Sequence, residues 1–334
     1  MDNASVPETD YRHTSRRRPW DSLPEAVRAH LARQVGGQVA SVELAGGGFT
    51  HGFAGIVHGS SGGRVFAKAA PSVDTLIHPA YVRESRVVPL LPAGMPSPQL
   101  LAASDIEDDD GCHWQLLVYE AVDGRMPGRP WTGEDLAAVE AACTVSARLL
   151  SGFPAALAGT PVAEDLAAVP AVFGRIADGE APPWFLPDLS AEQARRFRDL
   201  LAFSPEALAG NAVLHGDLRP DNILVRSGTA MFCDWNFLGT GAAWIDWVGV
   251  LPYARGGGMD VEAWLKRSAL TRDIPADRID AFLAALLAYM INSGCSPEVE
   301  ASPHLRSHGR HTARLVYDWA AARWSDKGHL ALRQ

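Results

Sequence analysis

The stretch "AVLHGDLRPDNILV", residues 212–225, carries two Asp, an Arg and an Asn inside an otherwise apolar segment. Within it, Asn222 follows Asp217 by five residues. One interpretation is a polar turn that joins two short buried strands, with Gly216 and Pro220 as turn residues. The other is a catalytic loop, whose flanking strands hold carboxylate and amide oxygens at a fixed separation. The stretch alone does not decide between the two.

A further carboxylate follows the stretch. Asp234 stands in "FCDWN", at the end of a second apolar run that "RSGTA" joins to the first. Two adjacent strands with this connection would bring Asn222 and Asp234 side by side. Mg²⁺ in proteins is usually held by one or two such oxygen ligands together with substrate phosphates and water. The sequence therefore predicts Asn222 and Asp234 as Mg²⁺ ligands for a phosphate-bearing substrate.

Charged and glycine-rich segments upstream fit such a substrate. Lys68 in "VFAKAA" would supply positive charge for phosphates, and Glu84 in the helical "YVRESRVV" is its expected partner. Each residue taken singly also fits a solvated strand end or helix face. The segment "LAGGGFTHGFAG" contains Gly47 and Gly48, and glycines let backbone amides approach the phosphates of a nucleotide. Glycine-rich hairpins are common, so this loop indicates a nucleotide site only in combination with Lys68 and Glu84.

In this order, the segments resemble the protein-kinase-like superfamily, and within it the aminoglycoside phosphotransferase family of small-molecule kinases. The resemblance runs from residue 38 to residue 320, and its most specific parts are "HGDLRPDNIL" and "CDWNFLGTGAAWIDW". It implies an α+β, two-lobed protein-kinase-like fold with a small antiparallel-sheet N-lobe and a larger, mainly helical C-lobe. It also implies these roles: Lys68 on the nucleotide phosphates, Glu84 on Lys68, Asp217 as catalytic base, and Asn222 and Asp234 on Mg²⁺.

The resemblance assigns further positions. Arg219 matches a catalytic-loop lysine of protein kinases, which implies contact with the γ-phosphate; a salt bridge to a neighbouring carboxylate is the alternative. The segment "LLVYEAVDG" resembles the hinge between the lobes, so the backbone of Glu120 and Val122 is expected to bind the nucleobase. Asp246 would tie the catalytic loop together, although "GTGAAWIDW" departs from the Gly-Asp-Pro common in the family. His215 is structural in this superfamily.

These roles imply a nucleoside-triphosphate-dependent O-phosphotransferase, with ATP or GTP as donor and a small-molecule hydroxyl as acceptor. The expected acceptor is an aminoglycoside or related antibiotic, and the expected role is antibiotic resistance. Relatives that phosphorylate choline, homoserine, macrolides or peptide antibiotics leave other acceptors open, as does a non-catalytic nucleotide-binding regulatory protein. A protein kinase is disfavoured, because only eleven residues separate Asp234 from Asp246 and no Ala-Pro-Glu segment follows.

Composition agrees with a cytoplasmic enzyme of small molecules. The 334 residues are 47% hydrophobic and 21% charged, which excludes global disorder. The net charge of −9 argues against nucleic acid as a partner and suits a cationic acceptor. The longest apolar run, residues 281–291, is too short to span a bilayer, and the first 20 residues lack a secretory signal core. The four scattered cysteines indicate neither zinc nor disulfides, and a monomer or homodimer is expected.

The chain divides into three predicted parts. Residues 1–20 are polar and aperiodic, which predicts a mobile arm, and they precede an N-lobe over residues 21–120 and a C-lobe over residues 121–328. The segment "SLPEAVRAHLARQVG", residues 22–36, has a Ser start, a Glu three positions later and a Gly stop, which predicts a capped helix. Strand-like runs follow as far as residue 120, and helical segments dominate beyond it.

A group of three tryptophans and a group of three histidines are interpreted as structural. Three tryptophans near the predicted metal loop are expected in the core or in a pocket wall: Trp235, Trp244 and Trp247. Three histidines could share a helix face as metal ligands, but two neighbouring arginines favour an exposed helix start: His304, His308 and His311.

Overall fold

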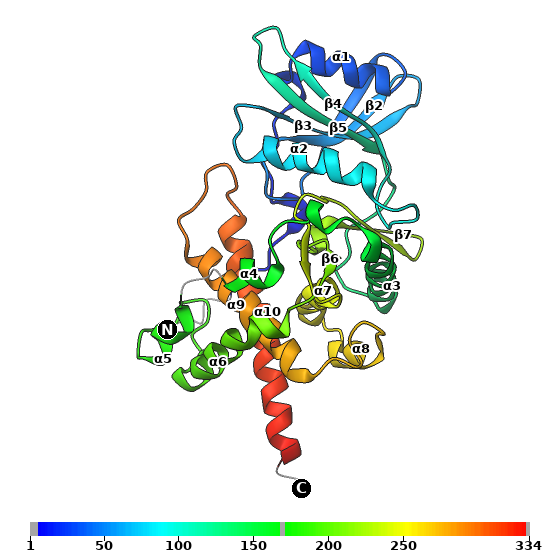
Figure 1. The fold of residues 1–334 in the computed structure, drawn as a ribbon. Coiled ribbons are helices and arrows are strands. Elements are labelled where there is room, and N and C mark those ends of the chain that lie inside the picture. The colour runs from blue at the N-terminus through cyan, green and yellow to red at the C-terminus, as the bar shows by residue number, and fades with distance from the viewer. Residues whose placement is uncertain (1–5, 168–170, 332–334) are drawn as a thin grey trace.

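The computed structural model describes residues 6–167 and 171–331, which form two lobes (Figure 1). The N-terminal lobe contains one antiparallel sheet in the order β1-β2-β3-β5-β4. Its strands are β1 (Val39–Leu44), β2 (Phe53–Gly59), β3 (Arg64–Pro71), β4 (Leu100–Glu107) and β5 (His113–Glu120). The predicted small antiparallel-sheet lobe is confirmed, and β5 ends at residue 120.

Both faces of this sheet are covered by helices. Helix α1 (Glu25–Gln34) shares a buried cluster with Leu116 and Val118 of β5, whereas α2 (Ile77–Val87) shares another with Leu117 and Tyr119. Successive side chains of a strand point to opposite faces, so a strand covered on both sides is buried continuously. This explains why "WQLLVY" in β5 is buried at every position, including the polar Gln115.

Helix α1 is present where the sequence predicts it, but the predicted Ser cap is wrong. Ser22 lies in a 3₁₀ turn (Trp20–Ser22), and its hydroxyl donates to the Pro19 carbonyl oxygen at 2.7 Å. Pro24 occupies the N-cap position, and the helix begins at Glu25. The ring of Pro24 fixes its own φ, which sets the direction of the chain into the helix without a side-chain cap.

The C-terminal lobe is mainly helical, as expected. Its helices are α3 (Gly133–Leu149), α4 (Val162–Ala167), α5 (Val172–Ala177), α6 (Ala191–Ala207), α7 (Ile245–Gly256), α8 (Val261–Arg267), α9 (Ala276–Cys295) and α10 (Leu305–Ala331). Two short ribbons accompany them: β6 (Ala212–Leu214) with β9 (Gly239–Gly241), and β7 (Ile223–Arg226) with β8 (Thr229–Phe232). Across the described ranges, none of the helices combines the length and the apolar character that a membrane crossing requires.

The strands on either side of the opening stretch pair with different partners. β6 pairs with β9 and β7 pairs with β8, so the stretch does not join two strands of one ribbon. The predicted hairpin of β7 and β8 is present. Ser227 and Gly228 at its turn have φ values of 49° and 76°, the pair of positive angles that a tight I′-type turn needs. Asn222 and Cys233 lie side by side at its open end, where the Cys233 N–H donates to the Asn222 carbonyl oxygen at 2.9 Å.

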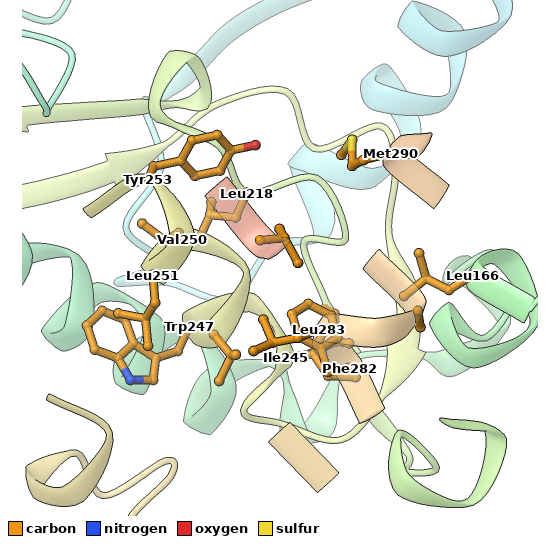
Figure 2. Close-up of a cluster of buried hydrophobic side chains, with 14 of the residues drawn as sticks. Leu166, Leu218, Ile245, Trp247, Val250, Leu251, Tyr253, Phe282, Leu283 and Met290 are labelled. Atoms are coloured by element: carbon orange, nitrogen blue, oxygen red, sulfur yellow. The ribbon is translucent and has the colours of Figure 1, made fainter. Parts of the chain in front are cut away.

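The core of the C-terminal lobe includes side chains of α7 and α9. Trp247 and Leu251 of α7 are fully buried, and Phe282 and Leu283 of α9 belong to the same cluster (Figure 2). The three tryptophans assigned to core or pocket wall are all buried: Trp235, Trp244 and Trp247. This core supports the chain segments that carry the polar loop between β6 and β7.

Residues 6–20, here called the N-terminal arm, contact both lobes, in contrast to the mobile arm that their composition suggests. Tyr11 and Thr14 are buried, and the N–H groups of Thr14 and Ser15 both donate to the Gly46 carbonyl oxygen at 3.0 Å. Figure 1 shows the blue chain rising from the C-terminal lobe to the N-terminal lobe. Residues 1–5 of the expected arm lie outside the described residues. The arm is held by hydrogen bonds to distant segments, which a local hydrophobic pattern does not reveal.

The packing of Trp247 leads to a stability prediction. Its indole is fully buried beside Trp264, with ring centroids 6.1 Å apart, and its Nε1 has no hydrogen-bond partner among the described residues. Trp247→Ala should lower the free energy of unfolding by about 3–5 kcal/mol, because a large core side chain is removed. Trp247→Phe should cost less than half of that, since it keeps a ring and removes the unpaired N–H. Urea denaturation of both variants measures this, and equal losses would contradict it.

Candidate active site

The site is built around the ammonium of Lys68, which is 6% exposed in the middle of the N-terminal sheet. Its Nζ lies 2.9 and 3.0 Å from the two carboxylate oxygens of Glu84, on α2. The hydroxyl of Tyr119, on β5, donates to Glu84 Oε1 at 2.7 Å. Sheet and helix thus hold Lys68 and Glu84 together, in the pairing that the resemblance implies.

Asp234 reaches Lys68 from the C-terminal lobe. The two side chains form an ion pair, and Asp234 follows β8 with a φ of 65°, a left-handed conformation that is uncommon outside glycine. This backbone turn directs the carboxylate toward the N-terminal lobe. Burial acts to raise the pKa of Asp234, but the charge of Lys68 outweighs it, and the pKa lies below its ordinary value. Asp234 is therefore a carboxylate at neutral pH.

The catalytic-loop stretch, residues 215–222, brings Asp217 and Asn222 together. The Asn222 amide nitrogen lies 2.7 Å from the Asp217 carbonyl oxygen and 3.2 Å from its Oδ2. Burial raises the pKa of the Asp217 carboxyl above its ordinary value, although the adjacent Arg219 guanidinium opposes that shift. A carboxyl with a raised pKa is a better proton acceptor than an ordinary aspartate.

Arg219 contacts two carboxylates. Its Nη1 donates to Asp217 Oδ1 at 2.6 Å, while its Nε and Nη2 donate to the two oxygens of Asp221 at 2.9 and 3.1 Å. The side chain of Asp221 has no exposed surface. Asp221, the second Asp of the opening stretch, is thus the bidentate partner that orients Arg219, which is the salt bridge to a neighbouring carboxylate that the sequence offers as the alternative for Arg219. Its spacing of two residues from Arg219, beside an apolar strand, is the only sequence signal for this contact.

Asp246, at the start of α7, holds the other end of the loop. Its carboxylate accepts hydrogen bonds from the N–H groups of His215 at 2.8 Å and Gly216 at 3.1 Å. Gly216 has a φ of 79°, and a Cβ there would collide with the Phe237 carbonyl oxygen. The His215 Nε2 lies 2.8 Å from the Cys233 carbonyl oxygen, which joins the loop to the chain just before Asp234. His215 and Asp246 thus hold the backbone of the loop in place.

The oxygen atoms of Asn222 and Asp234 fit a hard divalent cation. Because the Asn222 amide nitrogen faces Asp217, the amide oxygen is turned away from that carboxylate and is available as a ligand. The Asp234 side chain is 35% exposed. Within residues 6–167 and 171–331 there is no group of three or more His, Cys, Asp or Glu that could hold a metal ion. An ion between Asn222 and Asp234 would complete its shell with phosphate and water oxygens, as Mg²⁺ usually does.

The proposed nucleotide contacts lie at the edges of this site. Gly48 has a φ of 87°, and Gly47 lies beside Asp221, so the glycine-rich loop (residues 45–51) covers the catalytic loop. The Glu120 N–H donates to the Gln99 carbonyl oxygen at 2.9 Å. The N–H of Glu120 is therefore already used within the N-terminal lobe.

The three histidines near the C-terminus do not form an exposed group. His308 on α10 is 4% exposed, and its Nδ1 lies 2.8 Å from the Tyr11 hydroxyl and 3.3 Å from the Thr312 hydroxyl. Its ring lies 4.9 Å from the ring of Phe49 in the glycine-rich loop. The expectation of an exposed helix start is therefore wrong for His308, because Tyr11 of the N-terminal arm covers it.

A buried lysine and glutamate in a sheet lobe, facing a loop Asp and Asn and a strand-end Asp, define a protein-kinase-like phosphotransferase. The chain belongs to the phosphotransferase enzyme family, whose model matches residues 57–292. The family resemblance noted from the sequence motifs is confirmed, and with it the predicted enzyme class. No curated protein sequence matches the chain significantly.

Solved structures share the fold at low sequence identity. A spectinomycin phosphotransferase in complex with ADP and spectinomycin has a TM-score of 0.59 at 11% identity, over 88% of this chain and 98% of that one. An amicoumacin kinase in complex with AMP-PNP and Ca²⁺ has a TM-score of 0.53 at 13% identity, over 86% and 92%. A choline kinase from Cryptosporidium parvum has a TM-score of 0.51 at 10% identity, over 92% and 96%. Both the fold class and the two-lobed arrangement are thereby confirmed.

The environment of His308 predicts a pH dependence of stability. Burial lowers the pKa of His308 well below its ordinary value, and the positive charge of Arg219 and the neighbouring His311 act in the same direction. Tyr11 and Tyr253 also face this region. In the unfolded chain the imidazole gains a proton near pH 6.5, about its reference pKa, whereas the folded protein resists protonation. Stability contributed by neutral His308 is therefore complete above that pH and is lost below it.

The measurement is the free energy of unfolding between pH 5 and 7.5 for wild type, His308→Gln and the control His304→Gln. His308→Gln should reduce the fall in stability toward low pH, while His304→Gln, at an exposed position of the same segment, should leave the slope unchanged. Identical slopes in all three proteins would contradict the assignment.

Proposed function

We propose that the protein is a nucleoside-triphosphate-dependent O-phosphotransferase that transfers the γ-phosphoryl group to a hydroxyl of a small molecule. One observation carries the proposal: Lys68 is held by Glu84 in one lobe and bound by Asp234 of the other. A buried ammonium beside a strand-end carboxylate suits a polyphosphate and its counter-ion. Membership of the phosphotransferase enzyme family supports the same reaction class.

In this mechanism Asp217 accepts or orients the proton of the acceptor hydroxyl. Its raised pKa suits that role, and its hydrogen bond from Asn222 fixes the direction of the carboxylate. The acceptor oxygen forms a bond to the γ-phosphorus while the bond to the leaving nucleoside diphosphate breaks, in line with the attack. Catalysis then depends on positioning and on charge neutralisation more than on a covalent intermediate with the protein.

The remaining charged groups bind the donor. Lys68 contacts the α- and β-phosphates, Asn222 and Asp234 hold Mg²⁺, and the ion neutralises charge on the β- and γ-phosphates when it is bound. Arg219 is positioned by Asp221 and donates to Asp217, and this contact supports a role for its guanidinium beside the acceptor hydroxyl and the transferred group. Glu120 and Val122 supply the backbone edge for the nucleobase of ATP or GTP.

The proposed acceptor is an aminoglycoside or a related antibiotic. The similar structures include a spectinomycin phosphotransferase and an amicoumacin kinase, and the chain itself has a net charge of −9, which suits a cationic compound. Choline-like acceptors form the second candidate class, because a choline kinase shares the fold. Asp234 and Asp246 are joined by β9 and a short turn, which leaves no room for a long peptide-docking segment between them.

The assignment of Asp217 is tested by Asp217→Asn. The variant should lower phosphoryl transfer by about 10²–10⁴-fold, the usual worth of a general base, because the amide cannot accept the hydroxyl proton. Nucleotide affinity should stay within a few-fold, since the phosphates are bound by other residues. Asp199→Asn, at an exposed position on α6, is the matched control and should keep full activity. A loss confined to nucleotide binding would contradict the base role.

The acceptor class is tested by a phosphorylation screen with labelled ATP and GTP. Aminoglycosides, macrolides, peptide antibiotics and amino alcohols are offered in turn, with Asp217→Asn as the blank. Transfer to a member of one class identifies the acceptor. Nucleotide binding without transfer to any compound would favour a regulatory protein, and label found only on polypeptide would favour a protein kinase.

A further inference from the structure

The N-terminal arm donates hydrogen bonds to the carbonyl oxygens of the glycine-rich loop. Every carbonyl oxygen from Ala45 to His51 accepts a hydrogen bond from outside the loop, and the arm supplies the donor for all of them except Phe49. Phe49 instead accepts from the hydroxyl of Ser302 in the C-terminal lobe. A loop rich in glycine has the greatest conformational freedom to lose on ordering, so seven fixed carbonyl groups are a strong restraint.

Arg17 makes the largest share of these contacts. Its Nε donates to the Ala45 carbonyl oxygen at 3.2 Å, its Nη2 to that of Gly47 at 2.5 Å, and its Nη1 to that of Thr50 at 2.8 Å. The planar guanidinium therefore joins both limbs of the loop through one rigid group. The other donors belong to Thr14, Ser15 and Arg18. The Thr14 hydroxyl lies 2.6 Å from the Gly48 oxygen and the Ser15 hydroxyl 2.5 Å from the Thr50 oxygen.

The fixed carbonyl groups determine where the amide groups point. In a planar trans peptide the N–H of each residue lies opposite the C=O of the residue before it. The carbonyls of residues 45–48, which are directed at the arm, therefore turn the N–H groups of residues 46–49 away from it. Successive backbone N–H groups that share a concave side form a favourable site for phosphate oxygens.

The arm is itself anchored to the C-terminal lobe. The Tyr11 hydroxyl lies 2.8 Å from His308 Nδ1, and its ring packs edge-on against Tyr253 of α7 at 6.0 Å between centroids. Tyr11 also packs against Phe49, at the tip of the glycine-rich loop, at 6.3 Å. The guanidinium of Arg219, in the catalytic loop, lies over the Phe49 ring, 5.1 Å from its centroid. The arm thus sets the position of the loop relative to the catalytic loop.

We propose that the N-terminal arm is a structural part of the donor site, and that Arg17 is a positioning residue that holds the glycine-rich loop in its phosphate-binding shape. Arg17 acts through the loop amides and not by contact with the reacting atoms. This inference rests on the proposed use of a nucleoside triphosphate. It requires the fork of an arginine, because a lysine ammonium cannot donate to Ala45, Gly47 and Thr50 in the same geometry.

The experiment measures affinity for a non-hydrolysable ATP or GTP analogue with Mg²⁺ by calorimetry, in the full-length chain. Arg17→Ala and Arg17→Lys should each weaken binding by about ten-fold, the value expected for losing one charge-assisted hydrogen bond of net benefit. Arg16→Ala removes the same charge from an exposed neighbouring position and should bind like wild type. Thr14→Val removes only the hydroxyl donor to Gly48 and should weaken binding in the same direction.

Hydrogen exchange provides a readout that does not depend on activity. The amides of residues 46–50 should exchange faster in Arg17→Ala than in Arg16→Ala, while those of β3 and β5 should be unchanged. Unfolding midpoints of all variants show whether the fold is intact, and Thr14→Val serves the test if Arg17→Ala does not fold.

The outcomes separate the two proposals. If wild type binds neither analogue, the proposed function fails and the role of Arg17 fails with it. If wild type binds but Arg17→Ala binds as well as Arg16→Ala, only the role of the arm is overturned. Tighter binding by Arg17→Ala would make the arm a barrier to the nucleotide and would also overturn it. Full rescue by Arg17→Lys would show that charge alone acts, against a positioning role.

Discussion

The ammonium of Lys68 is buried between two carboxylates that come from different lobes, and the geometry of the site depends on this contact. Removing a charge from water costs several kcal/mol unless partners and hydrogen bonds compensate it. Glu84 supplies one partner from α2, with Tyr119 donating to it, and Asp234 supplies the other. Burial acts to lower the pKa of Lys68, but the two carboxylates raise it above its ordinary value, so the lysine stays charged. The ion pair also holds Asp234 toward the N-terminal lobe.

The polar loop below Lys68 is stabilised in the same way. Asp246 accepts two backbone N–H groups, Asn222 donates to Asp217, and Arg219 lies between Asp217 and Asp221. Each buried charged or amide group therefore has a partner inside the loop or at the start of α7. Such a network is rigid because any rotation leaves a buried polar group unpaired, which costs about 1–3 kcal/mol. This rigidity suits a reaction that depends on positioning.

The N-terminal arm extends these contacts around the outside of the site. It binds the glycine-rich loop through its carbonyl groups and covers His308 on α10 through Tyr11. The loop, the arm and the C-terminal lobe thus form one hydrogen-bonded unit above the catalytic loop. A phosphate-binding loop that is ordered before the nucleotide arrives loses less conformational entropy on binding.

The sequence by itself determined the fold class, the enzyme family and the order of the charged residues. Alternating and continuous apolar runs specify the strands locally, and "HGDLRPDNIL" with "CDWNFLGTGAAWIDW" is specific enough to identify the family. The tertiary structure alone decided which further residues complete the site and how the loops around it are held. β6 pairs with β9 and not with β7, Asp221 orients Arg219, and Tyr11 meets His308 across 297 positions of sequence. Local propensity and periodicity describe neighbours along the chain, whereas these contacts are fixed by how distant segments pack, and no local pattern encodes them.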